Sequence, residues 1–463
     1  GYWKQGCSEK QAVFHLFFRR LPFHSGYAIA AGLEPVREIL DSFRFTDSDL
    51  EFLGGLTGND GQPLFEPAFL KYLGELRLTC DVDGIAEGTV VFQNEPLLRV
   101  RGPIIQCQIL ETILLNVVNF QTLIATKASR ICTAAQGESV LEFGLRRAQG
   151  IDGALSASRA AYIGGCAATS NVLAGKKYGI PVRGTHAHSW VMSFEDEPTA
   201  FSEYAAAMPN NCVFLVDTYD TLQGVRHAIE VGKRLAADGH RMVGIRLDSG
   251  DLAYLSIEAR KLLDDAGFPE AVIVASNDLD EHLIESLKHQ GAKISVWGVG
   301  TKLVTAYDQP ALGGVYKLGA VQDENGDWQP RMKISEQLIK SSIPGILQVR
   351  RIESDGQIIA DAIYDELTGL DDREMIVDPN DPLRIRPFPL KSSGADLLQP
   401  VMVNGILAGP PEPLTDARSR ASQQVSRLHA TIRRLVNPHD FPVGLDIGLH
   451  ERRWEMMQSR QGG

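Results

Sequence analysis

The sequence lacks the features that mark membrane, secreted and nucleic-acid-binding proteins. No uninterrupted apolar run approaches the roughly 18 residues of a membrane span. The six cysteines are scattered and form no Cys-x-x-Cys pair, which argues against a disulfide framework or a zinc ribbon and favours reduced thiols. Positive charge is not in excess, because the formal net charge is -12. These absences predict a cytoplasmic protein that binds neither nucleic acid nor membranes.

Signals at the chain start are also missing. The sequence has no signal peptide, and it begins with Gly-Tyr-Trp instead of a methionine, so we expect further residues upstream. It contains no internal repeat and no low-complexity segment. At 463 residues it exceeds the usual size of one hydrophobic core. We therefore expect two domains, or one barrel with large additions.

The middle of the chain alternates β-prone runs with helical segments. The runs are residues 139–143, 180–183, 213–217, 242–247, 271–275, 294–298 and 314–318. Strands separated by helices predict a parallel sheet, and seven of them favour a closed barrel over an open sheet. The sequence thus predicts an irregular seven-stranded TIM-like α/β barrel over residues 136–320.

The flanking segments read as α+β structure. The expected elements are a strand at 12–20, a helix at 26–43, a small antiparallel sheet within 77–100, a long helix at about 104–133, a hairpin of 345–351 with 357–364, and a final helix at about 416–435. We predict that residues 321–463 rejoin an N-terminal α+β domain of residues 1–135, so that the barrel is an insertion.

Two histidines follow one of the barrel runs. His186 and His188 lie where the apolar residues 180–183 give way to a loop, and strand ends carry the chemistry of α/β enzymes. A histidine beside an apolar run is more often structural than catalytic. The pair therefore needs support from its neighbours.

Charged residues end two other runs. Arg246, Asp248 and Asp251 combine a cation with carboxylates, as a phosphosugar and a divalent metal would require, and strand alternation puts Arg246 and Asp248 on one face. An ion pair at a sheet edge explains them equally well. Arg146 and Arg147 end another run, where a guanidinium suits phosphate or carboxylate and where one of the two is expected to be structural.

A glycine-rich turn follows the 294–298 run. In Gly298-Val299-Gly300-Thr301 the backbone amides could face a phosphate without obstruction by side chains. Glycine at such a turn also serves tight packing alone. Spacing does not decide between these two interpretations.

Together these segments resemble nicotinate phosphoribosyltransferases, over nearly the whole chain. The segments that carry the resemblance are residues 17–23, 142–150, 170–175, 184–190, 217–221, 245–252, 276–277, 298–301, 312–318 and 330–333. The resemblance implies that nicotinate attacks the anomeric carbon of phosphoribosyl pyrophosphate to give nicotinate mononucleotide and pyrophosphate, a step of NAD salvage. It also implies coupling to ATP hydrolysis through a phosphohistidine, which is the chemistry of an ATP-coupled ligase.

The family pattern assigns roles to individual residues. His188 matches the phosphorylated histidine, and we expect Asp217 to orient its other ring nitrogen. His186 would have a supporting role. The substrate contacts implied by the resemblance are Arg246 for the nicotinate carboxylate, Phe143 for the pyridine ring, Asp248 for ribose hydroxyls, Gly298, Gly300 and Thr301 for the 5-phosphate, and Arg146 for phosphate. ATP and Mg2+ are the implied cofactors, and we assign no residue as a metal ligand.

Ser170 bears on the choice of acceptor. Nicotinamide phosphoribosyltransferases carry a carboxamide-binding aspartate there, and a carboxylate would repel nicotinate. Serine thus favours the acid substrate, although it could equally be a helix cap beside Thr169.

The resemblance also implies a homodimer with shared active sites, to which Arg19 and Lys333 of a second subunit would contribute. The family begins with a short segment whose tyrosine stacks on the substrate from the partner. Tyr2 is not that residue, because Trp3 follows it directly. We expect a chain without that segment to bind nicotinate poorly.

Two rival functions stay open at this point. A quinolinate phosphoribosyltransferase shares the barrel but needs extra basic residues and no phosphohistidine, so His188 argues against it. A non-catalytic nucleotide sensor could also keep the fold. His188, Asp217, Arg246 and Asp248 together make the sensor the weaker interpretation.

Overall fold

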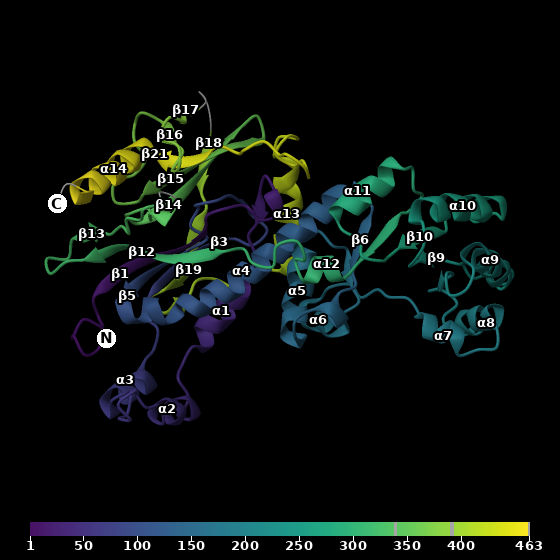
Figure 1. The fold of residues 1–463 in the computed structure, drawn as a ribbon, viewed down its shortest axis with the longest axis horizontal. Coiled ribbons are helices and arrows are strands. Elements are labelled where there is room, and N and C mark those ends of the chain that lie inside the picture. The colour runs from purple at the N-terminus through teal and green to yellow at the C-terminus, as the bar shows by residue number, and fades with distance from the viewer. Residues whose placement is uncertain (338–339, 389–392, 462–463) are drawn as a thin grey trace. The chain divides into compact units, whose positions relative to one another are not determined.

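The computed structural model describes residues 1–337, 340–388 and 393–461, which form two compact units (Figure 1). Unit 1 comprises Gly1–Thr122, Leu312–Arg434 and Pro438–Gly463, and unit 2 comprises Leu123–Ala311 with Leu435–Asn437. Unit 1 is therefore built from both ends of the sequence, and unit 2 from its middle.

Unit 1 contains a seven-stranded sheet in the order β13-β12-β1-β5-β3-β19-β20. Its strands are β1 (Gln11–Phe18), β3 (Asp81–Ile85), β5 (Leu98–Pro103), β12 (Gly314–Gln322), β13 (Trp328–Pro330), β19 (Leu398–Val403) and β20 (Ile406–Leu407). Every neighbouring pair in it is antiparallel. Strands from the second half of the sequence thus flank strands from the first hundred residues. The strand expected at 12–20 and the antiparallel sheet expected within 77–100 are confirmed.

A second sheet of unit 1 has six strands in the order β17-β16-β21-β15-β14-β18. They are β14 (Leu347–Ser354), β15 (Gln357–Asp365), β16 (Met375–Val377), β17 (Ile385–Pro387), β18 (Ser393–Asp396) and β21 (Val443–Asp446), and a short pair joins β2 (Ala28–Ile29) to β4 (Val90–Val91). The predicted hairpin is confirmed, because β14 pairs with β15 in antiparallel register around a tight turn.

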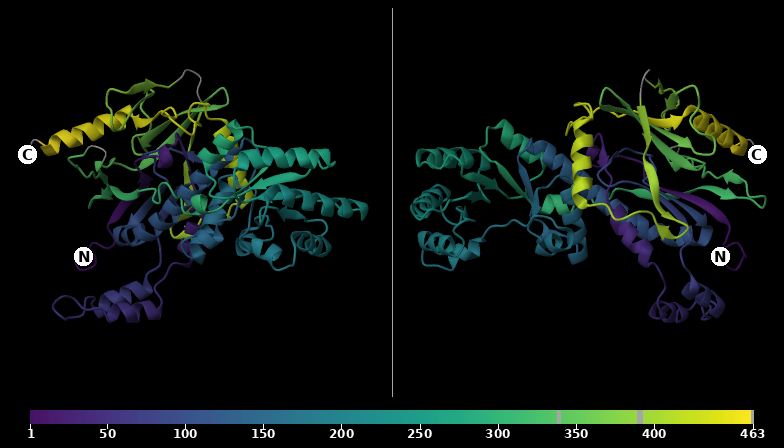
Figure 2. Two further views of the ribbon diagram at one scale, coloured as in Figure 1. Left: turned by 45° about the vertical axis from the view of Figure 1, so that its right-hand side comes forward. Right: turned by 180° about the vertical axis from the view of Figure 1, so that it is seen from behind.

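The helices of unit 1 correct two predictions. They are α1 (Leu33–Ser42), α2 (Asp47–Gly54), α3 (Pro67–Glu75), α13 (Leu414–Ser426) and α14 (Ile447–Gln461), with the short η1 (Pro22–His24). The helix expected at 26–43 begins only at Leu33, since residues 28–29 pair with β4 and Gly32 has a left-handed φ of 104°. The helix expected at 416–435 ends at Ser426, and α14 is the last helix instead. Helices α2 and α3 form a hairpin that projects from the rest of unit 1 (Figure 2).

Unit 2 contains a parallel six-stranded sheet in the order β7-β6-β11-β10-β9-β8. Its strands are β6 (Ser139–Glu142), β7 (Ala168–Thr169), β8 (Val213–Leu215), β9 (Gly244–Leu247), β10 (Val272–Ala275) and β11 (Val296–Val299). The helices are η2 (Leu145–Arg147), α5 (Ile151–Ile163), α6 (Val172–Tyr178), α7 (His188–Met192), α8 (Glu197–Ala207), α9 (Thr221–Ala237), α10 (Leu252–Asp265), α11 (Glu281–His289) and α12 (Thr301–Val304). The alternation of strand and helix makes every neighbouring pair parallel.

Two of the seven strands predicted for the irregular barrel need correction. The 314–318 run belongs to β12, which pairs with β1 in unit 1, and the 180–183 run makes only a single bridge from Val182 to Thr169. Within the described ranges, no strand pairing joins β8 to that bridge. The sheet of unit 2 is therefore not closed by strand pairing.

The long helix expected at 104–133 is α4 (Ile104–Ala135). By length and composition alone it could cross a membrane, since an 18-residue window has a mean hydropathy of 1.4. Half of that window is buried inside the protein. Leu110 and Leu114 are fully buried in unit 1, and Ile124 and Ile131 in unit 2. This pattern is typical of a core helix, because its apolar side chains already have protein partners.

The last turns of α4 carry a buried ionic cluster in unit 2. Lys127 and Arg130 both pair with Glu281 of α11, at 2.7 and 2.8 Å, and all three side chains are at most 2% exposed. Burial opposes ionisation of Glu281, but the two cations outweigh it and lower its pKa. A buried charge is tolerable only when it is paired in this way. The cluster therefore anchors α4 to α11.

Buried His15 leads us to expect that the stability of unit 1 depends on pH. Its Nε2 accepts a hydrogen bond from the Leu347 amide at 3.1 Å, and burial, followed by the charge of Arg99, lowers its pKa from 6.5 to about 3. The neutral ring thus stabilises the fold fully above about pH 6.5. We expect the free energy of unfolding to fall by about 1.4 kcal/mol per pH unit as the pH drops from there toward 3.

Chemical denaturation across this pH range tests the expectation. His15→Gln is the matched variant, because its amide oxygen can accept from Leu347 and does not titrate. The variant should show a shallower loss of stability than the parent chain. Equal slopes in the two proteins would rule out His15 as the titrating group.

Candidate active site

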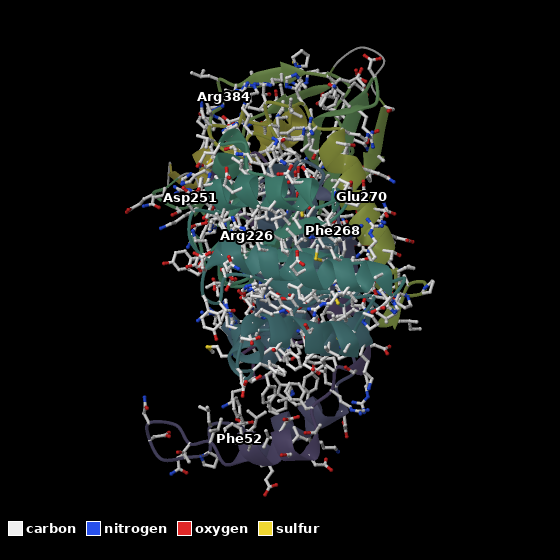
Figure 3. The ribbon with its side chains drawn as sticks, turned by 90° about the vertical axis from the view of Figure 1, so that its right-hand side faces the viewer. Phe52, Arg226, Asp251, Phe268, Glu270 and Arg384 are labelled. Carbon is white, nitrogen blue, oxygen red and sulfur yellow. The ribbon has the colours of Figure 1, made fainter. Side chains whose placement is uncertain are left out.

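The predicted site residues lie at the carboxyl-terminal edge of the parallel sheet in unit 2. Phe143, Asp217, Asp248 and Ser276 directly follow or lie next to the ends of β6, β8, β9 and β10. Figure 3 labels Asp251, the N-cap of α10, and Glu270, which follows that helix and precedes β10, on opposite sides of the view. Parallel strands end at one edge, so side chains distant in sequence meet there.

Arg246 lies at the centre of the site. Its Nε donates to Ser276 Oγ at 2.9 Å, and its two terminal nitrogens donate to Thr185 Oγ1 and Asp248 Oδ1, each at 2.8 Å. The guanidinium carbon lies 5.9 Å from the centre of the Phe143 ring. Of the five N–H groups of an arginine, these bonds leave one on each terminal nitrogen. Arg246 is thus rigidly held and can still receive a carboxylate with two hydrogen bonds.

Asp248 connects Arg246 to His188. One carboxylate oxygen accepts from Arg246 and from Ser276 Oγ, and the other lies 3.7 Å from His188 Nε2. Burial opposes ionisation, but the hydrogen bond from Ser276 and the charge of Arg246 outweigh it and lower the pKa of Asp248. The sequence prediction that Arg246 and Asp248 share a face is confirmed. A carboxylate held ionised here can stabilise positive charge that develops beside it.

His188 begins α7, and its ring partner differs from the expected one. Its Nδ1 lies 3.2 Å from Thr218 Oγ1, the residue after Asp217. Asp217 instead accepts from the Asp248 amide at 2.8 Å and from Ser249 Oγ at 2.6 Å. Asp217 therefore joins the ends of β8 and β9 and positions Asp248, and the orienting contact to His188 comes from a hydroxyl. The other Asp217 oxygen is buried without a partner in the described part of the chain.

Gly298 serves the placement of Phe143. It lies within β11, and a Cβ added there would come within 2.8 Å of the Phe143 ring. Real side chains do not approach so closely. This contact supplies a packing reason for the glycine that is independent of any phosphate.

The remaining predicted phosphate contacts surround the same turn. Gly300 is the N-cap of α12, Thr301 is its first residue, and both are partly exposed. Arg146 is exposed in η2, and no residue of the described ranges holds it by an ion pair or hydrogen bond. Arg147 is likewise exposed. The structure thus brings the glycine turn and Arg146 to the same edge, where an anion would have access.

Buried Glu142 organises the neighbouring loops. It accepts from Ser158 Oγ at 2.8 Å, from Thr169 Oγ1 at 2.6 Å, and from the Gly144 amide. The half-buried Ser170 donates its backbone N–H to Glu142 O at 2.9 Å. Asn171, not Ser170, caps α6. The alternative that Ser170 is a helix cap is therefore wrong.

Sequence reasoning missed the hydroxyl groups that hold the charged residues. Thr185, Thr218, Ser249 and Ser276 lie in segments that carry the resemblance, but none was given a role. All four also lie at or just beyond β-prone runs, which is the signal that could have pointed to them. Asn277, next to Ser276, has φ of +101°, and strained residues of this kind gather at functional sites.

Metal-ligating side chains do not gather into one cluster in the described part of the chain. Among residues 1–337, 340–388 and 393–461, no group of three or more His, Cys, Asp or Glu side chains is arranged to hold one.

Comparisons with known proteins agree over almost the full length. Family models match the nicotinate phosphoribosyltransferase N-terminal domain at residues 1–119, the nicotinate phosphoribosyltransferase family at 139–339 and its C-terminal domain at 348–453. Nicotinate phosphoribosyltransferase of Bacillus subtilis is 48% identical over 96% of this chain and 90% of its own length. The Homo sapiens protein of that name is 36% identical over 97% and 93%.

A solved structure supports the fold independently. The crystal structure of human nicotinic acid phosphoribosyltransferase superposes with a TM-score of 0.84 at 32% identity, covering 98% of this chain and 97% of that one. Sequence identity, domain models and fold thus agree along the chain. The chain belongs to the nicotinate phosphoribosyltransferase family.

Proposed function

We propose that the chain is a nicotinate phosphoribosyltransferase of NAD salvage, which forms nicotinate mononucleotide and pyrophosphate and couples this to ATP hydrolysis through His188. The observation that carries the proposal is that Arg246, Asp248 and His188 lie together at one sheet edge. A single carboxylate contacts both a cation suited to an acid substrate and a histidine suited to phosphorylation.

Nicotinate would bind with its carboxylate on Arg246 and its ring against Phe143. Three fixed acceptors orient the guanidinium, which limits the conformational entropy lost on binding. Ser170, on the loop beside Phe143, is uncharged, so it would not repel the carboxylate of nicotinate as an aspartate there would. These features favour an acid over an amide as the acceptor.

Phosphoribosyl pyrophosphate would lie between Arg246 and the turn at 298–301. Its ribose hydroxyls would bond to Asp248, and its 5-phosphate to the backbone of Gly300 and Thr301, with Arg146 as a further cation. The pyridine nitrogen then bonds to the anomeric carbon as the carbon–oxygen bond to pyrophosphate breaks. Positive charge develops on the ribose in this step, and the ionised Asp248 can stabilise it.

His188 would attack the γ-phosphate of ATP through Nε2. Nδ1, at 3.2 Å from Thr218 Oγ1, then carries the ring proton, so that Nε2 keeps its lone pair toward the site. The phosphorus–nitrogen bond forms as ADP leaves, and water later removes the phosphate. Exposure of about two-fifths of the side chain leaves room for the nucleotide.

Mg2+ would enter bound to the phosphate groups of the substrates. Phosphate oxygens and water are its usual ligands in such sites. Bound there, it would neutralise the pyrophosphate leaving group.

We propose further that the enzyme is a cytoplasmic homodimer whose partner supplies Arg19 and Lys333, and that its sheet is an irregular barrel. In support of the barrel, the side chain of His186 accepts from the Leu215 amide and so spans the gap beside β8.

Substitution of Gly298 tests the placement of the ring. Gly298→Ala should push Phe143 out of position and raise the KM for nicotinate by about fivefold, because overpacking typically costs about 1 kcal/mol or more. The control is the KM for phosphoribosyl pyrophosphate, measured by steady-state kinetics on the same variant, which should stay unchanged. A rise in the KM for phosphoribosyl pyrophosphate alone would instead support a phosphate role for Gly298.

A comparison of acceptors tests the function itself. The chain should form mononucleotide from nicotinate in clear preference to nicotinamide and quinolinate, measured by chromatography of the products. Preference for quinolinate would support the rival phosphoribosyltransferase. Binding of nucleotide with no product from any acceptor would support the sensor.

A further inference from the structure

The loop at residues 184–187 carries residues that face two parts of the site. Thr185 accepts from Arg246, and His188 follows three positions later beside Asp248. His186 lies between them and is only 9% exposed. In the described part of the chain, its ring makes no hydrogen bond to Arg246 or to Asp248. Its role must therefore lie in what it does to the loop.

The ring of His186 bonds to the edge of the sheet. Its Nε2 accepts from the Leu215 amide of β8 at 3.2 Å. The Val216 amide bonds to Arg246 O in β9, so by strand alternation the Leu215 amide points away from β9, toward the unpaired edge. Leu215 is fully buried, and a buried amide needs an acceptor. The histidine thus takes the place of a missing neighbouring strand.

Packing fixes the ring in this position. Tyr204 of α8 lies edge-on at 4.8 Å between ring centres, and Phe201 lies at 6.1 Å. Trp190 of α7 donates its indole N–H to Ala200 O of α8 at 3.0 Å, which ties α7 to the same helix. The loop is therefore attached to the unit on both sides of His188.

We propose that His186 is a positioning residue for the phosphorylation step: its bond to the β8 edge holds the 184–187 loop so that His188 Nε2 stays beside Asp248. The inference rests on the proposed function of His188. It assigns no contact with substrate to His186. Misplacement of a reacting group by about 1 Å can cost about 10²-fold in rate, so loss of this attachment should slow phosphorylation.

The ring is kept in the form that the bond requires. Burial lowers the pKa of His186, the hydrogen bond to Ala187 O opposes this, and the charge of Arg246 adds to the lowering. The neutral ring with its proton on Nδ1 can accept at Nε2. That tautomer also places the Nδ1 proton toward Ala187 O, at 3.4 Å.

Two substitutions separate the hydrogen bond from the packing. His186→Gln can present an amide oxygen near the position of Nε2, whereas His186→Leu fills similar space and accepts nothing. The measurement is the initial rate of radiolabelled phosphate transfer from the γ-position of ATP to the full chain. We expect about a tenfold or larger loss in His186→Leu, and a rate in His186→Gln much closer to that of the parent.

An unchanged rate in a folded His186→Leu would overturn the proposal, as would equal losses in the two variants. If His186→Leu does not fold, nitrogen NMR of the parent chain decides: a proton on Nε2 of His186 instead of Nδ1 contradicts the attachment. If the proposed phosphorylation of His188 does not occur, the parent chain itself will take up no label. That result can be told apart from a loss of label in the His186 variants alone.

Discussion

Replacing Arg246 with glutamine is expected to lower kcat/KM for nicotinate by between about 30-fold and about 4,000-fold. Loss of one partner from a desolvated charge pair costs about 2–5 kcal/mol, and each 1.4 kcal/mol is about tenfold. The loss should be seen mainly in the KM for nicotinate. The preference for nicotinate over nicotinamide should shrink at the same time, because the neutral carboxamide of nicotinamide forms no charge pair with Arg246.

Arg246→Lys is the matched control. It keeps the positive charge but loses the planar fork that holds Ser276, Thr185 and Asp248 together. Its effect should fall between those of the parent and the glutamine variant. A glutamine variant that keeps the parent KM for nicotinate, with only kcat reduced, would show that Arg246 acts on Asp248 and not on the carboxylate.

Replacing His188 with alanine is expected to abolish stimulation by ATP. The ratio of the rates of nicotinate mononucleotide formation with and without Mg-ATP should fall to about one, since no nucleophile remains for the γ-phosphate. Transfer of radiolabelled phosphate to the chain should vanish in the same variant. Both readouts report the same chemical step.

His289→Ala is a suitable control for this prediction, because His289 is an exposed histidine in the last turn of α11. It should keep both the label and the stimulation. Label that persists in His188→Ala would place the phosphorylated residue elsewhere, and stimulation that persists without label would exclude a phosphohistidine.

The outline of the parallel sheet could be predicted from the sequence because its strands are short β-branched runs separated by helices. Five of the seven runs are strands of this sheet. The 314–318 run is a strand too, but pattern cannot say which sheet a strand joins, and β12 pairs with β1 far away in sequence. The 180–183 run makes only one bridge, to Thr169, and nothing in its length explains this, since β8 pairs over three residues.

The charged part of the site was predictable, and its supporting hydroxyls were not. Arg246 and Asp248 stand two residues apart at a strand end, so alternation alone puts them on one face. The partner of His188 depends on which of two adjacent residues faces the ring, and the structure selects Thr218 over Asp217. Threonine and serine are common in loops, so their presence after a strand carries little information until the strands are placed side by side.

The most direct single measurement is the formation of nicotinate mononucleotide by the full-length protein, which includes the expected upstream residues, from nicotinate and phosphoribosyl pyrophosphate, with and without Mg-ATP. The linked Arg246, Asp248 and His188 predict that nicotinate is converted and that Mg-ATP raises the rate. If the folded protein binds ATP but forms no nicotinate mononucleotide under either condition, the proposed activity is contradicted.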